Sequence, residues 1–269
     1  MFIRLVAARK DQSADYDGKN ILTSSAGQIN QRAYSLGFGE TYLMGDGIVN
    51  ALHVTAVRTL NPRINPEIID LNDLGVKNVW VPFKGHMQMS VTNGFTISGS
   101  NVQPGYYNGF EGQIADDISL VRGSHQWGLG AYFSHVNFTG VSKVRSNPNF
   151  SFTGTRASTI AGVPDGTGTG LSDFLLGLPA NFSAGTFSEL YPRQNYIALY
   201  VQDSWKATPQ ITLNYGLRWE PFIAPYDGHK RHNFFSYDLY NSGFRSKTFR
   251  NAPIGTLMPG DAGVPDNGK

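Results

Sequence analysis

Residues 195–221 read NYIALYVQDSWKATPQITLNYGLRWEP and consist of two segments of alternating polarity joined by a polar turn. In the second segment every other residue is apolar, and the residues between them are small, polar or charged. The apolar set is Ile211, Leu213, Tyr215, Leu217 and Trp219, and the other set is Thr212, Asn214, Gly216, Arg218 and Glu220. This period of two predicts a β-strand with one apolar face.

The first segment alternates in the same way, and only Asp203 interrupts its apolar side. Its apolar residues are Ile197, Leu199, Val201 and Trp205, and residues 207–210 (ATPQ) form the predicted turn. The strand from Ile211 to Trp219 should measure about 26 Å, or about 20 Å vertically at a tilt of about 40°. Such a hairpin fits a transmembrane β-barrel, and it also fits a soluble β-sandwich.

The composition of the 269 residues agrees with alternating strands and polar loops. Aromatic residues make up 13% and charged residues only 16%, and there are 31 glycines. No apolar run of about 18 residues occurs, which excludes a transmembrane helix but leaves a β-barrel open. The absence of cysteine rules out disulfides and thiolate metal sites. A net charge of +2 without a basic stripe gives no support to nucleic-acid binding.

Two further hairpins are visible. Residues 34–42 and 52–57 alternate on either side of Gly45-Asp46-Gly47, and residues 118–133 alternate around Gly123-Ser124, which suits a type II′ turn. Between the hairpins lie long mixed segments, 61–112 and 137–191, followed by a tail from residue 222 with strand-like residues at 234–240. Residues 94–98 look β-like, and residues 171–179 predict a short helical turn before Pro179.

The connections therefore alternate between long and short along the whole chain. Outer-membrane barrels have this asymmetry, with short periplasmic turns and long extracellular loops. A soluble sandwich would not be expected to sort its loop lengths in this way. The sequence predicts an all-β, antiparallel, partial transmembrane β-barrel of about seven strands.

Three segments resemble, in this order, the barrel of TonB-dependent outer-membrane receptors, and most of all the large Oar-like branch. They are residues 173–179 (DFLLGLP), 200–206 (YVQDSWK) and 212–220 (TLNYGLRWE), and the hairpin 117–133 fits the same pattern. The resemblance implies a bacterial outer-membrane location, contact with membrane lipid, and energy-coupled uptake of a large scarce solute of the siderophore, oligosaccharide or peptide class. It also implies that the energy-coupling TonB system acts through a plug domain.

The chain departs from that family in several ways. Such receptors have a signal, an energy-coupling box, a plug domain, a barrel of about 22 strands and a terminal aromatic strand, none of which is recognised here. We therefore expect residues 1–269 to be an internal piece of a longer receptor, with the plug and the terminal strands absent. The isolated piece should aggregate, because a partial barrel has two unpaired edges.

Motifs for chemistry are almost absent, so no enzyme activity and no cofactor are predicted. His229 and His232 have a spacing that could ligate a metal, but no further ligand completes the site, and a solvated basic loop is the preferred interpretation. Residues 15–18 (DYDG) resemble the start of a calcium loop without its distal Glu. Asp116 and Asp117 are adjacent, so on a strand they point to opposite faces, and they are expected to mark its start.

Two groups of residues could bind a solute. The expected lumen-facing residues are Gln202, Lys206, Arg218 and Glu220. The expected loop residues are Tyr106, Tyr107, Phe110, Phe187 and Tyr191, together with Phe182. The plainer alternative is that these charges solvate the lumen and these aromatic rings pack the loops together.

Two rival functions remain open at this point. One is a soluble extracellular β-sandwich that binds carbohydrate through aromatic loops, for which Leu217→Arg should prevent folding. The other is a β-rich hydrolase, for which no nucleophile or carboxylate pair can be nominated.

Overall fold

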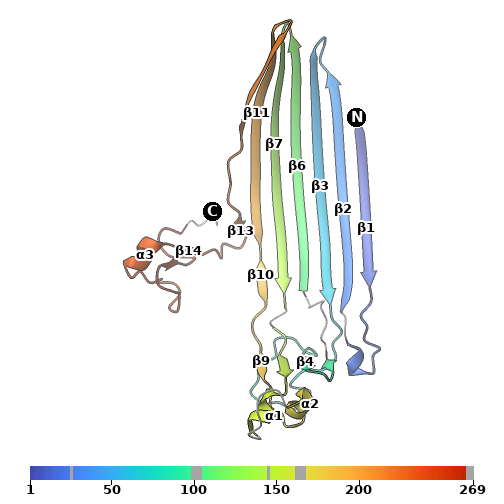
Figure 1. Ribbon diagram of the computed structural model, residues 1–269, viewed down its shortest axis with the longest axis vertical. Coiled ribbons are helices and arrows are strands. Elements are labelled where there is room, and N and C mark those ends of the chain that lie inside the picture. The colour runs from blue at the N-terminus through green and yellow to red at the C-terminus, as the bar shows by residue number, and fades with distance from the viewer. Residues whose placement is uncertain (25–26, 98–104, 144–145, 161–167, 265–269) are drawn as a thin grey trace.

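Seven long strands form one antiparallel sheet in the computed structural model (Figure 1). The structure describes residues 1–24, 27–97, 105–143, 146–160 and 168–264. The seven strands are β1 (Phe2–Gln12), β2 (Gln28–Leu43), β3 (Ile48–Ile64), β6 (Gly105–Arg122), β7 (His125–Ser142), β11 (Pro192–Thr208) and β12 (Ile211–Trp219). They are neighbours in the order in which they follow one another in the sequence. The predicted all-β, antiparallel class is confirmed, and the predicted number of about seven matches the long strands of a sheet that also contains two short ones.

The connections between these strands differ at the two ends of the sheet. The β2–β3, β6–β7 and β11–β12 turns are short and lie together at the top of Figure 1. Gly123 has a φ of 62°, which agrees with the first central position of a type II′ turn. The long connections leave from the opposite end. The predicted alternation of long and short connections is therefore confirmed.

The strands are longer than the alternating segments predicted. β6 and β7 contain 18 residues each, so each measures about 60 Å along its axis. The predicted long connections 61–112 and 137–191 were wrong at their ends, because pairing continues as far as Gly105 and Ser142. Glycines made these ends look like loops, but on the sheet they accommodate aromatic rings. A Cβ on Gly140 would lie 2.9 Å from the ring of Phe138.

Cross-strand register gives the sheet two chemically different faces. The apolar face includes Ile3, Leu36, Val54, Ile114, Leu129, Val201 and Leu217. The polar face includes Arg4, Gly37, Thr55, Gln113, Gly128, Gln202 and Gly216. The residues Leu5 and Leu217 are 77% and 72% exposed. A soluble β-sandwich would bury this face against a second sheet, so its exposure argues against that alternative.

The described residues 65–97, 146–160 and 168–187 of the long connections fold into one compact body, which we call the loop lobe. It contains a second sheet in the order β5 (Thr96–Ile97), β4 (Gln88–Val91), β8 (Asn149–Phe152) and β9 (Asn181–Ser183). Strands β4 and β8 come from different connections and pair in parallel, Gln88 opposite Asn149. The helices α1 (Thr155–Ile160) and α2 (Gly170–Leu175) complete the lobe at the bottom of Figure 1. Helix α2 confirms the predicted helical turn before Pro179.

The chain after β12 runs back along β11. Strand β13 (Tyr226–Asp227) pairs with the start of β11, and β10 (Ser188–Leu190) pairs with β7. Strands β14 (Phe234–Phe235) and β15 (Thr256–Leu257) pair with each other, and a 3-10 helix, η1 (Ile21–Thr23), lies in the first connection. The strand predicted for 234–240 was wrong beyond residue 235. Ser236 caps the helix α3 (Tyr237–Asn241) by accepting the N–H of Leu239.

No helix in the described part of the chain is long and apolar enough to cross a membrane.

Candidate functional site

The polar face carries a row of four directly opposed residues on neighbouring strands. Asp117 on β6 lies opposite Gly130 on β7, which lies opposite Tyr200 on β11, which lies opposite Arg218 on β12. The Tyr200 hydroxyl donates a hydrogen bond of 2.6 Å to Oδ1 of Asp117. To reach it, the ring crosses over Gly130, where a Cβ would lie only 2.0 Å from a ring carbon. Glycine at position 130 is therefore what allows this bond.

Next to this row, on the side of the short turns, lies a hollow of about 600 Å³. Its floor is formed by Gly216 and by the side chain of Gln202, which lies over Gly128 in the next cross-strand row. Its remaining polar-face lining consists of Val49, Ala51, Asp117, Ser119, Gln126, Tyr200, Ser204 and Asn214. A smaller hollow, lined in part by Tyr200, Gln202, Gly216 and Arg218, adjoins it. We call the two hollows together the polar trough.

The four predicted lumen-facing residues lie on or beside this face. Gln202 forms part of the trough floor, and Arg218 lies at its edge. Nε of Arg218 lies 2.5 Å from Oε2 of Glu220, so the two side chains form an ion pair. Lys206 lies opposite Thr212, nearer the turn, and does not line the trough. The structure thus brings Gln202 and Arg218 together and leaves Lys206 apart.

Sequence reasoning missed Asp117 and Tyr200. It correctly separated Asp116 from Asp117, because Asn50 on β3 donates to Asp116 on the apolar face while Asp117 bonds Tyr200 on the polar face. It was wrong to place the two carboxylates at the start of a strand, since β6 begins at Gly105. The available signal was the pairing of Tyr200 on β11 with Gly130 on β7, and this pairing can be recognised only when the register between the two strands is known.

The predicted loop residues are divided between the sheet and the connections. Tyr106, Tyr107 and Phe110 belong to β6, so placing them in a loop was wrong. The guanidinium carbon of Arg63 lies 4.8 Å from the centre of the Tyr107 ring. Phe187 and Tyr191 do lie in the connection, on either side of β10.

Phe187 and Phe182 each pack against another aromatic ring. The centre of the Phe187 ring lies 6.2 Å from that of Phe83. Phe182 belongs to β9 in the loop lobe, where its ring centre lies 4.8 Å from that of Phe150. Both contacts agree with the packing alternative.

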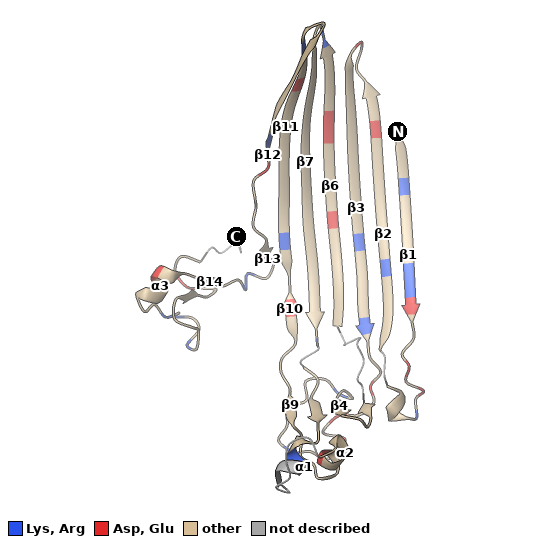
Figure 2. Cartoon of the chain, in the orientation of Figure 1, with Lys and Arg blue, Asp and Glu red and all other residues tan. Residues whose placement is uncertain are grey.

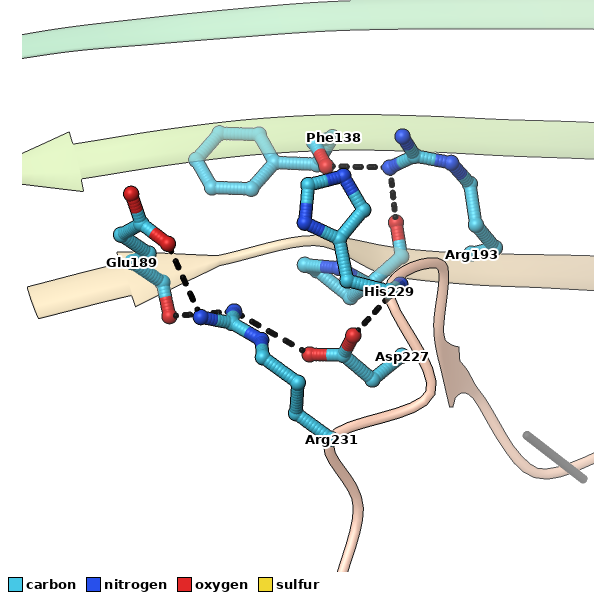
Figure 3. Close-up of polar contacts among 7 residues, drawn as sticks. Phe138, Glu189, Arg193, Asp227, His229 and Arg231 are labelled. Carbon is cyan, nitrogen blue, oxygen red and sulfur yellow. Dashed lines mark hydrogen bonds and ion pairs between the residues drawn. The ribbon is translucent and has the colours of Figure 1, made fainter. Parts of the chain in front are cut away.

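A cluster that includes Glu189, Asp227, His229 and Arg231 holds the returning chain against the wall (Figure 3), and Tyr191 takes part in it. The ring of His229 stacks on the Tyr191 ring at 3.6 Å between centres, and the Arg231 guanidinium carbon lies 4.8 Å from the Tyr191 ring centre. Arg231 donates to Oε2 of Glu189 at 2.9 Å and to the Glu189 carbonyl at 3.1 Å. Residues 226–231 are therefore held against the sheet, while residues 228–231 remain exposed, as expected for a solvated basic loop.

The two histidines with metal-ligand spacing do not converge in the structure. His229 stacks on Tyr191, whereas His232 packs against Phe234 with ring centres 5.0 Å apart. Among the described residues, no group of three or more His, Cys, Asp or Glu side chains is placed to hold a metal ion.

The break at Asp203 in the apolar face has a structural explanation. Oδ2 of Asp203 accepts the Tyr215 hydroxyl at 2.7 Å and lies 2.6 Å from Nδ1 of His125. The His125 ring lies nearly parallel to Trp127 and Trp205, with ring centres 5.8 and 5.5 Å away. Asp203 itself is only 2% exposed. These rings cover the carboxylate and let an acidic residue lie on an apolar surface.

A second buried carboxylate, Asp173, holds the loop lobe together. It accepts the backbone N–H groups of Gly154 at 2.8 Å, Ala157 at 2.7 Å and Arg156 at 3.3 Å, and thereby joins α2 to the start of α1. Burial acts to raise the pKa of Asp173, but these N–H groups outweigh burial and hold the pKa below its usual value. Asp173, the first residue of the DFLLGLP segment, therefore has a structural role: it clamps α2 to the start of α1.

Charged residues are scattered thinly along the long strands (Figure 2). This agrees with a wall that meets an apolar medium on one face. The chain matches the family described as "Outer membrane beta barrel domain" over residues 1–268. Comparisons with curated proteins and with solved structures gave no match. The chain therefore belongs to the outer-membrane β-barrel domain family and is located in the bacterial outer membrane.

Proposed function

We propose that this chain forms part of the barrel wall of a TonB-dependent receptor of the Oar-like branch, which takes up a large scarce solute across the outer membrane. The energy-coupling system would act through a plug domain held within the completed barrel. The chain would bind and pass the solute without a catalytic step and without a cofactor. The solute belongs to the siderophore, oligosaccharide or peptide class.

The open sheet is the observation that carries this proposal. In the described residues, β1 pairs only with β2, and β12 pairs only with β11. Because lipid offers no hydrogen bonds, both edges must pair with further strands in the membrane. A sheet that is still open after seven strands fits a wide barrel, and receptors of the proposed class have about 22 strands.

The length of the strands gives further support. An outer-membrane barrel has an apolar band about 25 Å tall, whereas β6 and β7 measure about 60 Å along their axes. Even when tilted, they extend well beyond the membrane, on the side where the loop lobe lies. Long extracellular walls and folded loops suit the capture of a solute too large for a simple pore.

Uptake measurements test the proposal. The receptor that contains this chain is expressed in cells with an intact or an inactivated energy-coupling system. Each strain is then given a labelled ferric siderophore, a neutral oligosaccharide and a peptide. We expect one of the three to be taken up only in the coupled strain. Equal uptake in both strains would indicate a passive pore and would refute energy coupling, and absence of uptake of all three would refute the transport function as proposed.

A further inference from the structure

We propose that the polar trough binds a neutral, polyhydroxylated solute of the oligosaccharide class. This inference rests on the proposed function, because it places the trough on the inner wall of a transporting barrel. It selects one of the three solute classes left open above.

The floor of the trough lets a flat solute approach the wall closely. Gly216 is exposed and carries no side chain. The absence of a Cβ at Gly128 lets the Gln202 side chain lie over the neighbouring strand, because a Cβ there would be only 2.9 Å from it. Glycine commonly marks places where a ligand lies close to the backbone. On a strand the N–H and C=O groups are already used in the ladder, so this floor supplies contact area and the hydrogen bonds must come from the rim.

The rim is rich in neutral groups that both donate and accept hydrogen bonds. The hydroxyls and amides of the rim and floor belong to Ser119, Gln126, Gln202, Ser204 and Asn214. A sugar hydroxyl also donates and accepts, so each of these groups can pair with it. The ring of Tyr200, held in place by Asp117, adds one aromatic surface of the kind on which the C–H face of a sugar can lie.

The charges of the trough disfavour an anionic solute. Arg218 is the one cationic side chain that lines the trough in the described residues, and Glu220 already pairs with it. The carboxylate of Asp117 lies on the rim, and the Tyr200 hydroxyl is the one side chain of the described residues that donates a hydrogen bond to it. An anionic ferric siderophore or a uronic-acid oligomer would therefore meet negative charge without a free cation to offset it.

Equilibrium binding to the purified full-length receptor in detergent tests this inference. Calorimetry is carried out with three neutral hexasaccharides, an α-glucan, a β-glucan and a xylan. A galacturonic-acid hexamer, an anionic ferric catecholate siderophore and a hexapeptide serve as comparison ligands. We expect saturable binding of at least one neutral hexasaccharide, and weaker or no binding of the other three ligands. Tighter binding of any comparison ligand, or no binding of the neutral three, overturns the assignment.

Two substitutions locate the binding in the trough. Gly128→Val displaces the Gln202 side chain that lies over Gly128, and should weaken binding of the neutral hexasaccharide by about tenfold or more, equivalent to about 1.4 kcal/mol. Gln202→Leu keeps the volume but removes the amide, and should also weaken binding. The control is Gly37→Val on β2, which adds the same side chain on the same face where no atom lies within 4 Å of the new Cβ. Folding of each variant is checked by its heat-dependent shift in gel mobility.

Unchanged affinity in both trough variants would overturn the site, and so would equal losses in Gly128→Val and Gly37→Val. These measurements do not depend on energy coupling. Binding without coupled uptake would therefore refute the proposed transport function and leave the sugar site intact, whereas coupled uptake of a siderophore with no sugar binding would refute the sugar site alone.

Discussion

The wall of seven long strands and the loop lobe are stabilised in different ways. In the wall the strands are held together mainly by backbone hydrogen bonds, and Val141 and Ala198 are the only buried apolar residues among the described residues of its strands. The loop lobe has a small core of its own, formed by Leu71, Met87, Val91 and Phe152. It also contains the buried carboxylates Asp70 and Asp173, which accept backbone N–H groups.

This difference shows what each region needs from its surroundings. The wall leaves its apolar face uncovered, so lipid must provide the medium that a second layer provides in a soluble protein. The loop lobe extends into water and buries its own apolar side chains. Its buried carboxylates accept backbone N–H groups that no helix or strand pairs. A substitution on the wall should therefore act through the membrane, and one in the lobe should act locally.

The largest effect is expected for Leu217→Arg on the apolar face of β12. Leu217 is 72% exposed, so the new charge faces lipid rather than a protein core. Arginine near the middle of the bilayer costs about 2–4 kcal/mol in an outer-membrane barrel. The full receptor should assemble in the outer membrane in clearly reduced amount, measured by the heat-modifiable fraction in isolated membranes.

The matched control is Asn214→Arg on the polar face of the same strand, which should assemble normally. If both variants assembled equally well, the assignment of the two faces would be wrong. If only Asn214→Arg failed, the faces would be reversed.

The next effect in size is expected for Gly130→Ala beneath Tyr200. The new Cβ would lie 2.0 Å from the ring and 2.5 Å from Oδ1 of Asp117, so the ring must move and the hydrogen bond must break. Such overpacking costs about 1–3 kcal/mol. Unfolding by urea in lipid vesicles should show this loss, whereas Gly37→Ala, with open space around its Cβ, should be close to wild type.

The contrast between the two regions also explains what the sequence could predict. A strand repeats every two residues, so the apolar and polar faces of β11 and β12 are visible in residues 195–221 without a structure. The short turns can also be predicted locally. Gly123, for example, has a positive φ that few residues other than glycine adopt. Strand alternation and turn residues were therefore sufficient to predict the regular part of the wall.

The sequence could not predict features that depend on register or on distant segments. Tyr200 meets Asp117 across 83 positions, and β4 pairs with β8 across 61. Asp173 was noticed only as part of a familiar segment, and its role as a clamp requires knowing that residues 154–157 lie beside it. The same limit placed Tyr106, Tyr107 and Phe110 in a loop, because glycines beside aromatic rings look alike in a loop and on a wide sheet.

Acid should open the loop lobe before it affects the wall. The pKa of Asp173 is lowered from 3.8, so the stabilisation by this carboxylate is complete above about pH 4 and is lost as the pH falls through the lowered pKa. The pKa of Asp70 is lowered in the same direction, chiefly by the Gly85 N–H. Hydrogen exchange followed by mass spectrometry, with labelling times scaled to the intrinsic rate at each pH, should show loss of protection in residues 146–160 below about pH 4.

Asp173→Asn provides the control for this acid response. The amide cannot accept all the backbone N–H groups that the carboxylate accepts, so the lobe should exchange faster at pH 7 and respond less to acid. Protection that stayed constant down to pH 2 in the wild-type protein would contradict the clamp.

The smallest effect is expected for Arg231→Gln, which removes the ion pair between the returning chain and β10 (Figure 3). The side chains of Arg231 and Glu189 are 41% and 28% exposed, and pairs of this kind contribute about 0–1 kcal/mol. Strand β13 pairs with β11 through only two residues, so even this loss should increase cleavage of residues 226–231 by an added protease. Lys230→Gln removes the same charge one residue away and should change cleavage little. High salt should reproduce the Arg231→Gln effect in the wild-type protein. Equal cleavage of both variants would mean that stacking of His229 on Tyr191, rather than the ion pair, holds this segment to the wall.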